Sequence, residues 1–429
     1  MSETKNVPKL RFRGFNEEWE EKKFGDVFEF YQTNSFPRSK LNYERENVYN
    51  IHYGDIHKKF PTLLDLNESE VPFINDDVDL SNIDEKSYLK EGDLLIADAS
   101  EDYEDIGKAV EIGNIYNKKV LGGLHTFLAR DNYKLTKKGY RRYILLNSLI
   151  KLEIKKIATG ISVLGISKTN LGKIIIKIPS IDEQEKIANF LSKVDEKINF
   201  LKDELGYLND FKKFCLQQLF AQKLRFADKN KNYFSDWEEN ILGSLGNTFT
   251  GLSGKTKEDF GKGKPYITYK SIFDSQKIDI NRVEFVNIDS DETQNKVEYG
   301  DIFFTTSSET PDEVGMASVL LNSLEECYLN SFSFGFRINS FKKINPEFFS
   351  FYLRSHIIRN EIKKLAQGST RFNLSKNALM KINILIPTLQ EQEKITNFLS
   401  AIDKKIELME NKIAKMEEFK KGLLQQMLI

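Results

Sequence analysis

Cysteine is almost absent from this 429-residue chain, and several other features that define whole classes of protein are missing too. The two cysteines, Cys215 and Cys327, are far apart and have no CxxC spacing, so the sequence predicts neither a disulfide framework nor a zinc site. The start of the chain is polar, and no stretch approaches the roughly 20 apolar residues of a membrane-spanning helix. These absences predict a cytoplasmic chain with no membrane partner.

Motifs for nucleotide, cofactor and metal chemistry are also missing. Gly254-Lys255-Thr256 resembles the end of a phosphate-binding loop, but Phe249 stands where the first glycine of that motif belongs. There is no glycine-rich nucleotide loop after a strand and no Asn/Asp-Pro-Pro-aromatic motif, and Pro311-Asp312 lacks the residues that complete a nuclease site. Without ligand or triad surroundings, we expect ordinary surface or core roles for His52, His57, His125 and His356. We therefore predict no catalytic residue, metal or cofactor on this chain.

Length and charge limit the possibilities only loosely. A chain of 429 residues exceeds one ordinary core and predicts two domains. The formal net charge of -1 argues mildly against a nucleic-acid partner, because neutralising phosphates needs Lys and Arg. Local clustering decides this question, and 63 basic residues are enough to form positive faces.

The chain is a tandem duplication. Residues 154–220 align without a gap onto residues 362–428, with nearly half of the positions identical. Weaker matches before this block pair Trp19 with Trp237, Ile51 with Ile267, and Gly92-Asp93 with Gly300-Asp301. Each copy is long enough to be a whole domain, so the repeat predicts two similar domains.

A strand, a proline and a helix start occur at matching places in the two copies. Isoleucines alternate at 174, 176 and 178 and again at 382, 384 and 386, which predicts a strand that Pro179 or Pro387 then ends. Ser180-x-x-Glu183 and Thr388-x-x-Glu391 follow. They predict capping boxes, in which the hydroxyl accepts from the third amide of the helix and Glu reaches back to the cap amide.

Apolar residues after each cap are spaced alternately four and three apart, as in a heptad seam. The first seam consists of Ile187, Leu191, Val194, Ile198, Leu201, Leu205 and Leu208. The second consists of Ile395, Leu399, Ile402, Ile406, Met409, Ile413 and Met416. Each helix could simply pack on its own domain, but two matched seams favour antiparallel pairing of the helices with each other.

Further apolar residues lie off these seams: Phe190, Phe200, Phe211, Phe214, Phe398 and Phe419. A two-stranded coil cannot bury all of them. They either contact the globular domains or form docking faces for helices of other subunits.

The order of strand, proline, cap and heptads at Ile174–Leu208 and Ile382–Met416 resembles the specificity subunit of type I restriction-modification systems. Its most specific marks are Glu183-Gln184-Glu185-Lys186-Ile187 and Glu391-Gln392-Glu393-Lys394-Ile395, and Pro8-Lys9-Leu10-Arg11-Phe12 supports it. The resemblance implies an α+β fold. Two similar target recognition domains, each a mixed sheet plus helices, are joined by two long antiparallel coiled-coil helices about a pseudo-two-fold axis. The implied boundaries are 1–181, 182–222, 223–388 and 389–429.

The resemblance also implies a function. Each target recognition domain reads one half of a bipartite site in double-stranded DNA, and the helices set the spacer and dock two methyltransferase (M) subunits. Motor-nuclease (R) subunits join for cleavage, while S-adenosylmethionine and the catalytic groups belong to the partner chains. The alternative is a coiled-coil scaffold that binds proteins without DNA specificity.

Polar loops before the repeated strands are candidate DNA contacts. They contain Gly160, Ser162 and Lys168 in the first copy and Gly368, Ser369, Thr370, Arg371 and Lys376 in the second. Glycine permits close backbone approach, and hydroxyls and cations suit phosphate oxygens, although ordinary turns with helix caps at Ser167 and Ser375 would look the same. Val163 stands where the second copy has Arg371, so the first domain must supply that cation elsewhere. Further candidates are Tyr53, Tyr269, Lys255, Lys257, Lys270, Thr306, Ser307 and Ser308.

Overall fold

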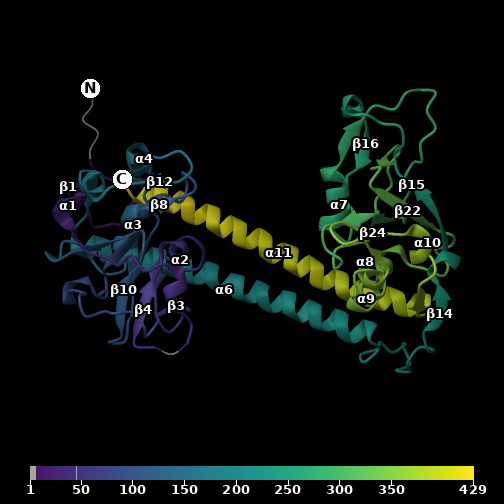
Figure 1. Cartoon of the computed structure of the whole chain (residues 1–429), viewed down its shortest axis with the longest axis horizontal. Coiled ribbons are helices and arrows are strands. Elements are labelled where there is room, and N and C mark those ends of the chain that lie inside the picture. Colours follow the sequence, from purple (N-terminus) through teal and green to yellow (C-terminus); the bar gives the residue numbers. More distant parts are fainter. Residues whose placement is uncertain (1–5, 45) are drawn as a thin grey trace. The chain divides into compact units, whose positions relative to one another are not determined.

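A computed structural model describes residues 6–44 and 46–429, which form two compact units with matching orders of elements (Figure 1). Unit 1 runs to Lys202 and takes up again from Asn411 to Ile429, and unit 2 comprises Asp203 to Glu410. These units divide each long helix between them, whereas the domain scheme drawn from the sequence gave each helix a segment of its own. Residues 1–5 of the predicted first domain lie outside the described residues.

Two sheets form the centre of unit 1. The larger has the strand order β2 (Glu29–Tyr31), β11 (Thr126–Arg130), β7 (Leu94–Ala97), β9 (Ala109–Ile112) and β5 (Leu63–Leu64). The smaller has the order β10 (Lys119–Gly122), β4 (Val48–Ile51), β6 (Phe73–Ile74) and β3 (Leu41–Asn42). Strand β7 is buried on both faces: Leu94 and Ile96 join one core cluster, and Leu95 and Ala97 join another. A strand covered on both sides is apolar throughout, without the alternation of a half-exposed strand.

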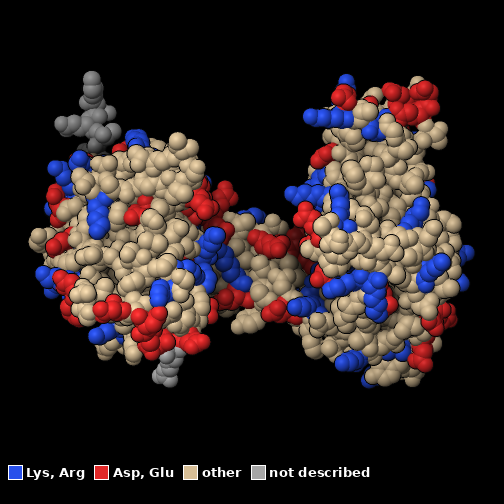
Figure 2. All heavy atoms as spheres, in the orientation of Figure 1, with Lys and Arg blue, Asp and Glu red and all other residues tan. Residues whose placement is uncertain are grey.

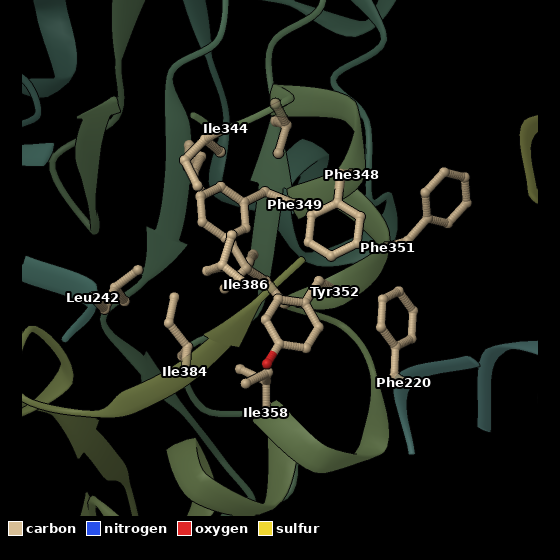
Figure 3. Packing of buried hydrophobic residues seen from close by; sticks show 14 of the residues in the cluster. Phe220, Leu242, Ile344, Phe348, Phe349, Phe351, Tyr352, Ile358, Ile384 and Ile386 are labelled. Carbon is tan, nitrogen blue, oxygen red and sulfur yellow. The ribbon is translucent and has the colours of Figure 1, made fainter. Parts of the chain in front are cut away.

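Unit 2 repeats this arrangement with fewer strands. Its larger sheet has the order β15 (Gly246–Thr250), β22 (Ser333–Ile338), β18 (Ile302–Thr305) and β20 (Ala317–Val319). Its smaller sheet has the order β17 (Glu284–Val286), β16 (Phe260–Ile267) and β21 (Tyr328–Leu329). The main core includes Phe348, Phe349 and Tyr352 of α8 (Pro346–Tyr352), and these rings lie near Phe220 from a long helix (Figure 3).

The predicted strand before each long helix is confirmed. In unit 1, β13 (Ile175–Ile178) pairs with β1 (Glu20–Lys23), and in unit 2, β25 (Asn383–Ile386) pairs with β14 (Glu238–Ile241). In both copies the second and fourth residues of the strand are buried. The repeated isoleucines therefore fix which face of each strand meets the core.

Two long helices, α6 (Ile181–Phe220) and α11 (Leu389–Met427), each contribute to both units. In unit 1, Lys420 Nζ lies 2.5 Å from Asp195 Oδ1, and Lys202 Nζ lies 2.7 Å from Glu417 Oε1. Residue numbers fall along α11 as they rise along α6, so the helices are antiparallel, as predicted. In unit 2, Lys212 Nζ of α6 lies 2.6 Å from Asp403 Oδ1 of α11. No helix among the described residues is both long enough and apolar enough to cross a bilayer.

The start of the first seam contacts both its own domain and the other helix. Ile187, Leu191, Val194 and Ile198 lie in the core cluster of unit 1, which contains Trp19 and Tyr143 of the domain and also Leu423 and Met427 of α11. In unit 2, Ile395, Leu399 and Ile402 share a cluster with Cys215 and Leu219 of α6. Leu205, Leu208, Ile406, Met409 and Met416 are partly exposed, whereas Leu201 and Ile413 are buried. Packing of each helix on its own domain and pairing of the two helices are therefore both found, each for part of the seam.

The glutamates of the expected capping boxes have a different partner. Glu391 N donates to Thr388 Oγ1 at 3.3 Å, which is the hydroxyl half of the box. The Glu391 carboxylate is 1% exposed and accepts from Arg225 Nε and Nη2, while Glu183 accepts in the same way from Arg11. Among the described residues, neither glutamate accepts from its cap amide and Ser180 Oγ does not accept from Glu183 N, so the predicted box is only half formed in unit 2 and is not formed in unit 1. An arginine from a preceding segment instead donates to both oxygens of each carboxylate.

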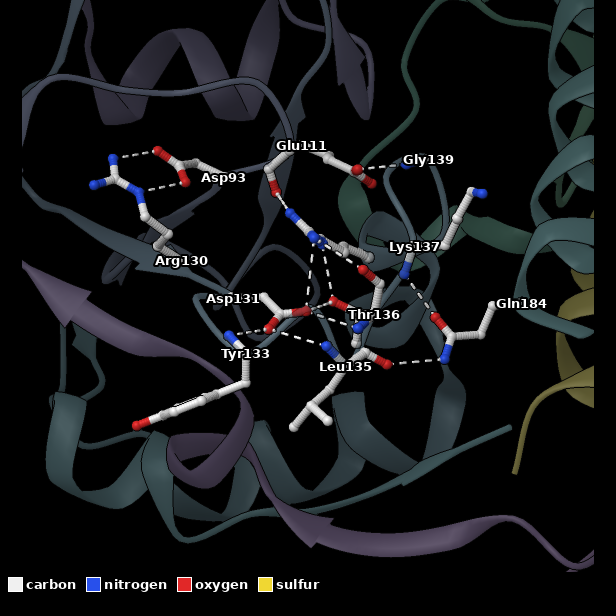
Figure 4. A network of polar contacts seen from close by, with 12 residues as sticks. Asp93, Glu111, Arg130, Asp131, Tyr133, Leu135, Thr136, Lys137, Gly139 and Gln184 are labelled. Carbon is white, nitrogen blue, oxygen red and sulfur yellow. Dashed lines mark hydrogen bonds and ion pairs between the residues drawn. The ribbon is translucent and has the colours of Figure 1, made fainter. Parts of the chain in front are cut away.

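The glutamine of each EQ pair joins the helix start to a neighbouring loop. Gln184 Oε1 accepts from Lys137 N at 2.7 Å, and its Nε2 donates to Leu135 O at 3.1 Å (Figure 4). The same Nε2 also donates to Pro179 O at 2.8 Å. Gln392 makes the same three bonds, to Asn345 N, Lys343 O and Pro387 O. Both glutamines are fully buried, so each amide group has its hydrogen-bonding capacity met by backbone. The EQ motif thus fixes where the long helices leave their domains.

The repeated Gly-Asp pairs are structural as well. Gly92 has a φ of 89°, a conformation that favours glycine, and Asp93 accepts from Arg130 Nε at 2.9 Å and Nη2 at 2.7 Å (Figure 4). Asp301 accepts in the same way from Arg337. The two ion pairs lie at equivalent places in the two central sheets.

Candidate nucleic-acid interface

The polar loops predicted to contact DNA meet the ends of the central strands. In unit 2, β18 continues into β19 (Ser307–Ser308), which pairs with β24 (Phe372–Leu374) directly after the loop that ends at Arg371. In unit 1, β8 (Ala99–Ser100) pairs in the same way with β12 (Leu164–Gly165). In each unit, two short strands therefore pair at an edge where residues far apart in sequence come together.

Several of the predicted residues of unit 2 line one recess, of about 630 Å³, called here the unit 2 recess. Tyr269 OH donates to Ser307 O at 2.7 Å, and Arg371 Nη2 donates to Ser307 Oγ at 3.1 Å. The whole lining consists of Tyr269, Phe273, Ser307, Ser308, Glu309, Glu313, Thr370 and Arg371. The structure thus brings together Tyr269, Ser307, Ser308, Thr370 and Arg371, which were selected from separate parts of the sequence.

The unit 2 recess combines donors, acceptors and a flat apolar wall. Arg371 is exposed and has free donors beyond its bond to Ser307, and the Tyr269 ring stacks on Phe273 with centroids 6.0 Å apart. Burial raises the pKa of Tyr269, so its hydroxyl stays a neutral donor. Guanidinium donors suit guanine N7 and O6, and carboxylates such as those of Glu309 and Glu313 suit the cytosine amino group. This chemistry can distinguish base edges in a major groove.

The equivalent edge of unit 1 carries histidines. Tyr53, the first residue of α2 (Tyr53–Lys58), has ring centroids at 4.7, 6.0 and 5.3 Å from those of His52, His57 and His125. His57 Nε2 lies 2.9 Å from Ala99 O of β8, and His125 Nδ1 lies 3.2 Å from Asp98 Oδ1. The expectation of unremarkable histidines missed this cluster, because three positions scattered over 74 residues of sequence meet only in the folded domain.

Burial and neighbouring charges shift the protonation of this histidine edge. Burial, together with the charge of Arg38, lowers the pKa of His52, whose Nδ1 accepts from Gly54 N at 3.2 Å. Burial also raises the pKa of Asp98, although nearby His125 acts in the opposite direction. The edge of unit 1 thus carries histidines, whereas the edge of unit 2 carries the guanidinium of Arg371.

The remaining candidates of the loops fall into two groups. Gly160, Ser162, Gly368 and Ser369 are exposed at the loops. Lys168 and Lys376 begin the short helices α5 (Lys168–Gly172) and α10 (Lys376–Leu379), which Ser167 and Ser375 cap, as the alternative interpretation expected. Lys168 Nζ donates to Tyr31 O at 3.3 Å. The loops are thus exposed, as a DNA contact requires, and they also contain the helix caps of the alternative interpretation. Lys168 and Lys376 lie beside the strand pairs β8–β12 and β19–β24.

The basic run of unit 2 is less available than its composition suggested. Lys255 is a correction: its side chain is 5% exposed and forms an ion pair with Glu292, so it cannot neutralise a phosphate. Thr306 donates its hydroxyl to Phe332 O at 2.8 Å and lies beside the unit 2 recess. Lys257 and Lys270 are exposed, and no ion pair found among the described residues involves either of them. Figure 2 shows cations and anions interspersed over the visible face of each unit, in keeping with the balanced charge.

A second recess, of about 890 Å³, lies in unit 1 and is called here the helix groove. Residues of α4 (Ser148–Ile157), α6 and α11 line it, and they include Lys151, Leu152, Lys421 and Leu424. The side chain of Arg142 in its wall is 5% exposed, and its Nε has no hydrogen-bond partner among the described residues. Burial lowers the pKa of Lys151. Carboxylates such as those of Glu104 and Glu417 also line the groove, so it combines apolar side chains with charges of both signs.

The off-seam aromatic residues fall into two groups: two pack on the core of a domain, and four are exposed. Phe190 packs on the unit 1 core with its ring centroid 5.8 Å from that of Phe12, and Phe398 packs on the unit 2 core with its centroid 5.7 Å from that of Phe226. The exposed residues of this set are Phe200, Phe211, Phe214 and Phe419. The exposed rings leave apolar surface on both helices.

Sequence reasoning missed Arg225, although a signal for it was present. Lys9-Leu10-Arg11-Phe12 recurs as Lys223-Leu224-Arg225-Phe226, and the arginine of each copy binds the glutamate of its own EQ pair. Extending the internal comparison to the first residues of the chain would have identified Arg11 and Arg225 as matching residues of the two copies.

Comparison with known proteins gives one family. Residues 16–209 and 234–418 each match the family model described as "Type I restriction modification DNA specificity domain". The chain is 28% identical over 352 residues to the putative type I restriction enzyme MjaX specificity subunit of Methanocaldococcus jannaschii, covering 79% of this chain and 77% of that protein. It is 24% identical over 273 residues to the EcoKI specificity subunit of Escherichia coli, covering 61% and 58%. The S subunit of M. genitalium has a similar fold, with a TM-score of 0.54, 16% identity and 99% of each chain covered.

Proposed function

Because this chain belongs to the type I restriction-modification DNA specificity family, we propose that it selects the DNA site for a type I complex, with each unit reading one half of a split sequence. The observation that carries this proposal is the unit 2 recess. A guanidinium, a tyrosine hydroxyl, two serines and two carboxylates converge there from three separate segments of the chain. Such a set of donors and acceptors suits base edges better than it suits phosphates alone.

Unit 1 reads the other half-site through a different set of groups. Its edge carries Tyr53 and His125 where unit 2 has Tyr269 and Phe332 at the matching positions of the sequence. Two related domains with different side chains at the same edge would prefer different bases. The target is therefore an asymmetric bipartite sequence, and the long helices set the number of base pairs between its halves.

Methyl transfer and cleavage belong to partner subunits in this proposal. The helix groove and the exposed rings of α6 and α11 are docking surfaces for methyltransferase (M) subunits, which carry S-adenosylmethionine, and motor-nuclease (R) subunits join for cleavage. This chain is then a non-catalytic subunit that acts on DNA in the cytoplasm. Leu152, which is 51% exposed in the groove, is a suitable probe: Leu152→Asp should weaken co-purification with M subunits without unfolding unit 1.

Selection from a pool of randomised duplexes tests the DNA-reading role. The full chain, bound to M subunits encoded with it, should enrich one split sequence. Arg371→Ala should relax the preference at one position of one half-site by about 1 to 3 kcal/mol, because a bidentate contact to guanine is lost. Arg371→Lys keeps the charge but not the planar pair of donors, so it should restore affinity more than specificity.

A scaffold without DNA specificity predicts a different result. The wild-type complex would then enrich no sequence and would bind DNA weakly even at low salt. That outcome would overturn the proposed function, and an unchanged half-site preference in Arg371→Ala would remove Arg371 from the reading surface.

A further inference from the structure

The loop that precedes β12 carries a fully exposed apolar side chain. Ile161 has a relative exposure of 102%, the highest among the large apolar residues described, and nearby Val163 is 56% exposed. Both lie in residues 160–163, called here the unit 1 tip. No side chain of the described chain covers Ile161, so folding gains nothing from its apolar character.

The unit 1 tip is a tight turn with a matching turn in unit 2. Thr159 and Gly165 exchange two backbone hydrogen bonds across it, of 2.9 and 2.7 Å, and Gln367 pairs with Asn373 at the equivalent place. Gly160 and Gly368 have φ values of 132° and 126°. These turns therefore have the same backbone course and hold the residues that follow in fixed directions.

The close approach of backbone in each turn excludes any residue but glycine at its start. A Cβ atom added to Gly160 would lie 2.0 Å from Val163 O, and one added to Gly368 would lie 2.2 Å from Arg371 O. The backbone of the turn is thus well defined in both units. The side chains on it differ between the units. Unit 1 presents Ile161 and Val163 where unit 2 presents Ser369 and Arg371.

The unit 1 tip adjoins the edge that carries the histidine cluster. Leu164 and Gly165, directly after the tip, pair with Ser100 and Ala99 of β8, and Ala99 O contacts His57. In unit 2 the equivalent turn supplies Thr370 and Arg371 to the recess. A surface that contacts DNA through this edge would therefore bring the tip against the duplex.

We propose that Ile161, supported by Val163, acts as an apolar wedge that enters the stack of base pairs at one step of the half-site read by unit 1. This inference rests on the proposed function. Apolar side chains of this size can partly unstack a step and kink the duplex, and flexible pyrimidine–purine steps cost least to deform. Unit 1 thus gains specificity from the deformability of its site, whereas unit 2 uses hydrogen bonds from Arg371.

Fluorescence of 2-aminopurine tests the wedge in the full complex of this chain with its M subunits. The probe is the duplex enriched from the randomised pool, with 2-aminopurine placed in turn along each half-site. Wild type should brighten one step of one half-site severalfold, in addition to any adenine extruded for methylation. The extruded adenine should brighten equally in all variants and serves as the internal control.

Three substitutions separate the wedge from other roles. Ile161→Ser should abolish the brightening at that step and weaken binding about tenfold, since burial of one isoleucine is lost. Ile161→Leu should keep both properties, and Ser369→Ile, the matched change in unit 2, should leave the unit 1 step unaffected. Thermal unfolding of Ile161→Ser should match wild type, because the side chain is fully exposed.

Each result points to one conclusion. Equal brightening and affinity for Ile161→Ser and wild type would overturn the wedge while leaving the proposed function intact. Weaker co-purification of M subunits with Ile161→Ser, at unchanged DNA fluorescence, would also overturn it and assign the tip to a protein contact. Failure of the wild-type complex to enrich any split sequence would instead overturn the proposed function itself.

Discussion

Arg225 Nη2 donates to Glu391 Oε2 at 2.8 Å, and this contact joins a segment that follows one long helix to the first turn of the other within unit 2. The Glu391 carboxylate is 1% exposed, and Arg225 also donates to Ser235 O at 2.7 Å. Arg11 and Glu183 form the same pair in unit 1. The glutamate of each EQ motif therefore forms a buried ion pair with an arginine more than 160 residues earlier in the chain.

Arg225→Ala should destabilise unit 2 by about 3 kcal/mol, because it leaves the Glu391 carboxylate buried without a partner. Hydrogen exchange measured by mass spectrometry should show faster exchange at the start of α11 and in β14, with unit 1 unchanged. The double variant Arg225→Met, Glu391→Leu is the control. It should recover most of the loss, since no buried charge remains, and a double variant as unstable as Arg225→Ala would show that the arginine acts through packing instead.

The sequence predicted the elements more completely than their contacts. Heptad spacing placed the long helices, and alternating isoleucines placed β13 and β25, because these signals are local and are repeated in both copies. Contacts between residues far apart in the sequence were not predictable in the same way, because they depend on the tertiary fold. The capping threonine Thr388 was identified, but Arg225 as the partner of Glu391 was not. The ion pair of Lys255 with Glu292 was not predictable either, because the fold alone brings the two side chains together.

The candidate interface shows the same limit. Tyr269, Ser307 and Arg371 were selected for their chemistry, and the fold gathers them because β19 pairs with β24. The histidines of unit 1 gave no signal, since neither their spacing nor their neighbours in sequence resemble a site. Their meeting around Tyr53 depends on how α2 packs beside the loop that carries His125.

Acid should destabilise unit 1 partly through His52. The pKa of His52 is lowered by burial, so the folded chain holds a proton less tightly than the unfolded chain does. Its contribution to stability is complete above the ordinary pKa of 6.5 and is lost as the pH falls below that value. Protonation of Nδ1 would also remove the bond that it accepts from Gly54 N.

His52→Asn should flatten this pH dependence, because asparagine can cap α2 without titrating. The free energy of unfolding of unit 1, measured between pH 5 and pH 7.5, should then decrease less steeply toward acid than in wild type. His57 and His125 are present in both proteins, so the difference isolates His52. An identical slope would show that the titration of His52 is not linked to folding.

The exposed lysines of unit 2 should affect affinity without affecting sequence preference. Lys270→Ala should weaken binding to all duplexes alike and reduce the slope of log affinity against log salt by about 1, as expected for one lost phosphate contact. Lys255→Ala is the matched control, because its side chain is already paired with Glu292 and should leave the salt slope unchanged. A changed base preference in Lys270→Ala would move this lysine from the phosphates to the base edges.

Lengthening both long helices should lengthen the DNA spacer. Seven residues inserted after Gly206 in α6 and seven after Glu410 in α11 preserve the heptad phase and lie away from the ion pairs Lys212–Asp403 and Lys202–Glu417. One heptad adds about 10 Å of helix, which corresponds to about three base pairs at 3.4 Å each. Duplex selection with the extended complex should therefore enrich the same half-sites with a spacer about three base pairs longer.

Insertion in α6 alone is the control for this experiment. It breaks the pairing of the seams on one side only, so it should reduce stability and yield no single new spacer. A doubly extended complex that keeps the original spacer would show that the separation of the half-sites is set by the partner subunits, because the helices had changed length while the recognised site had not.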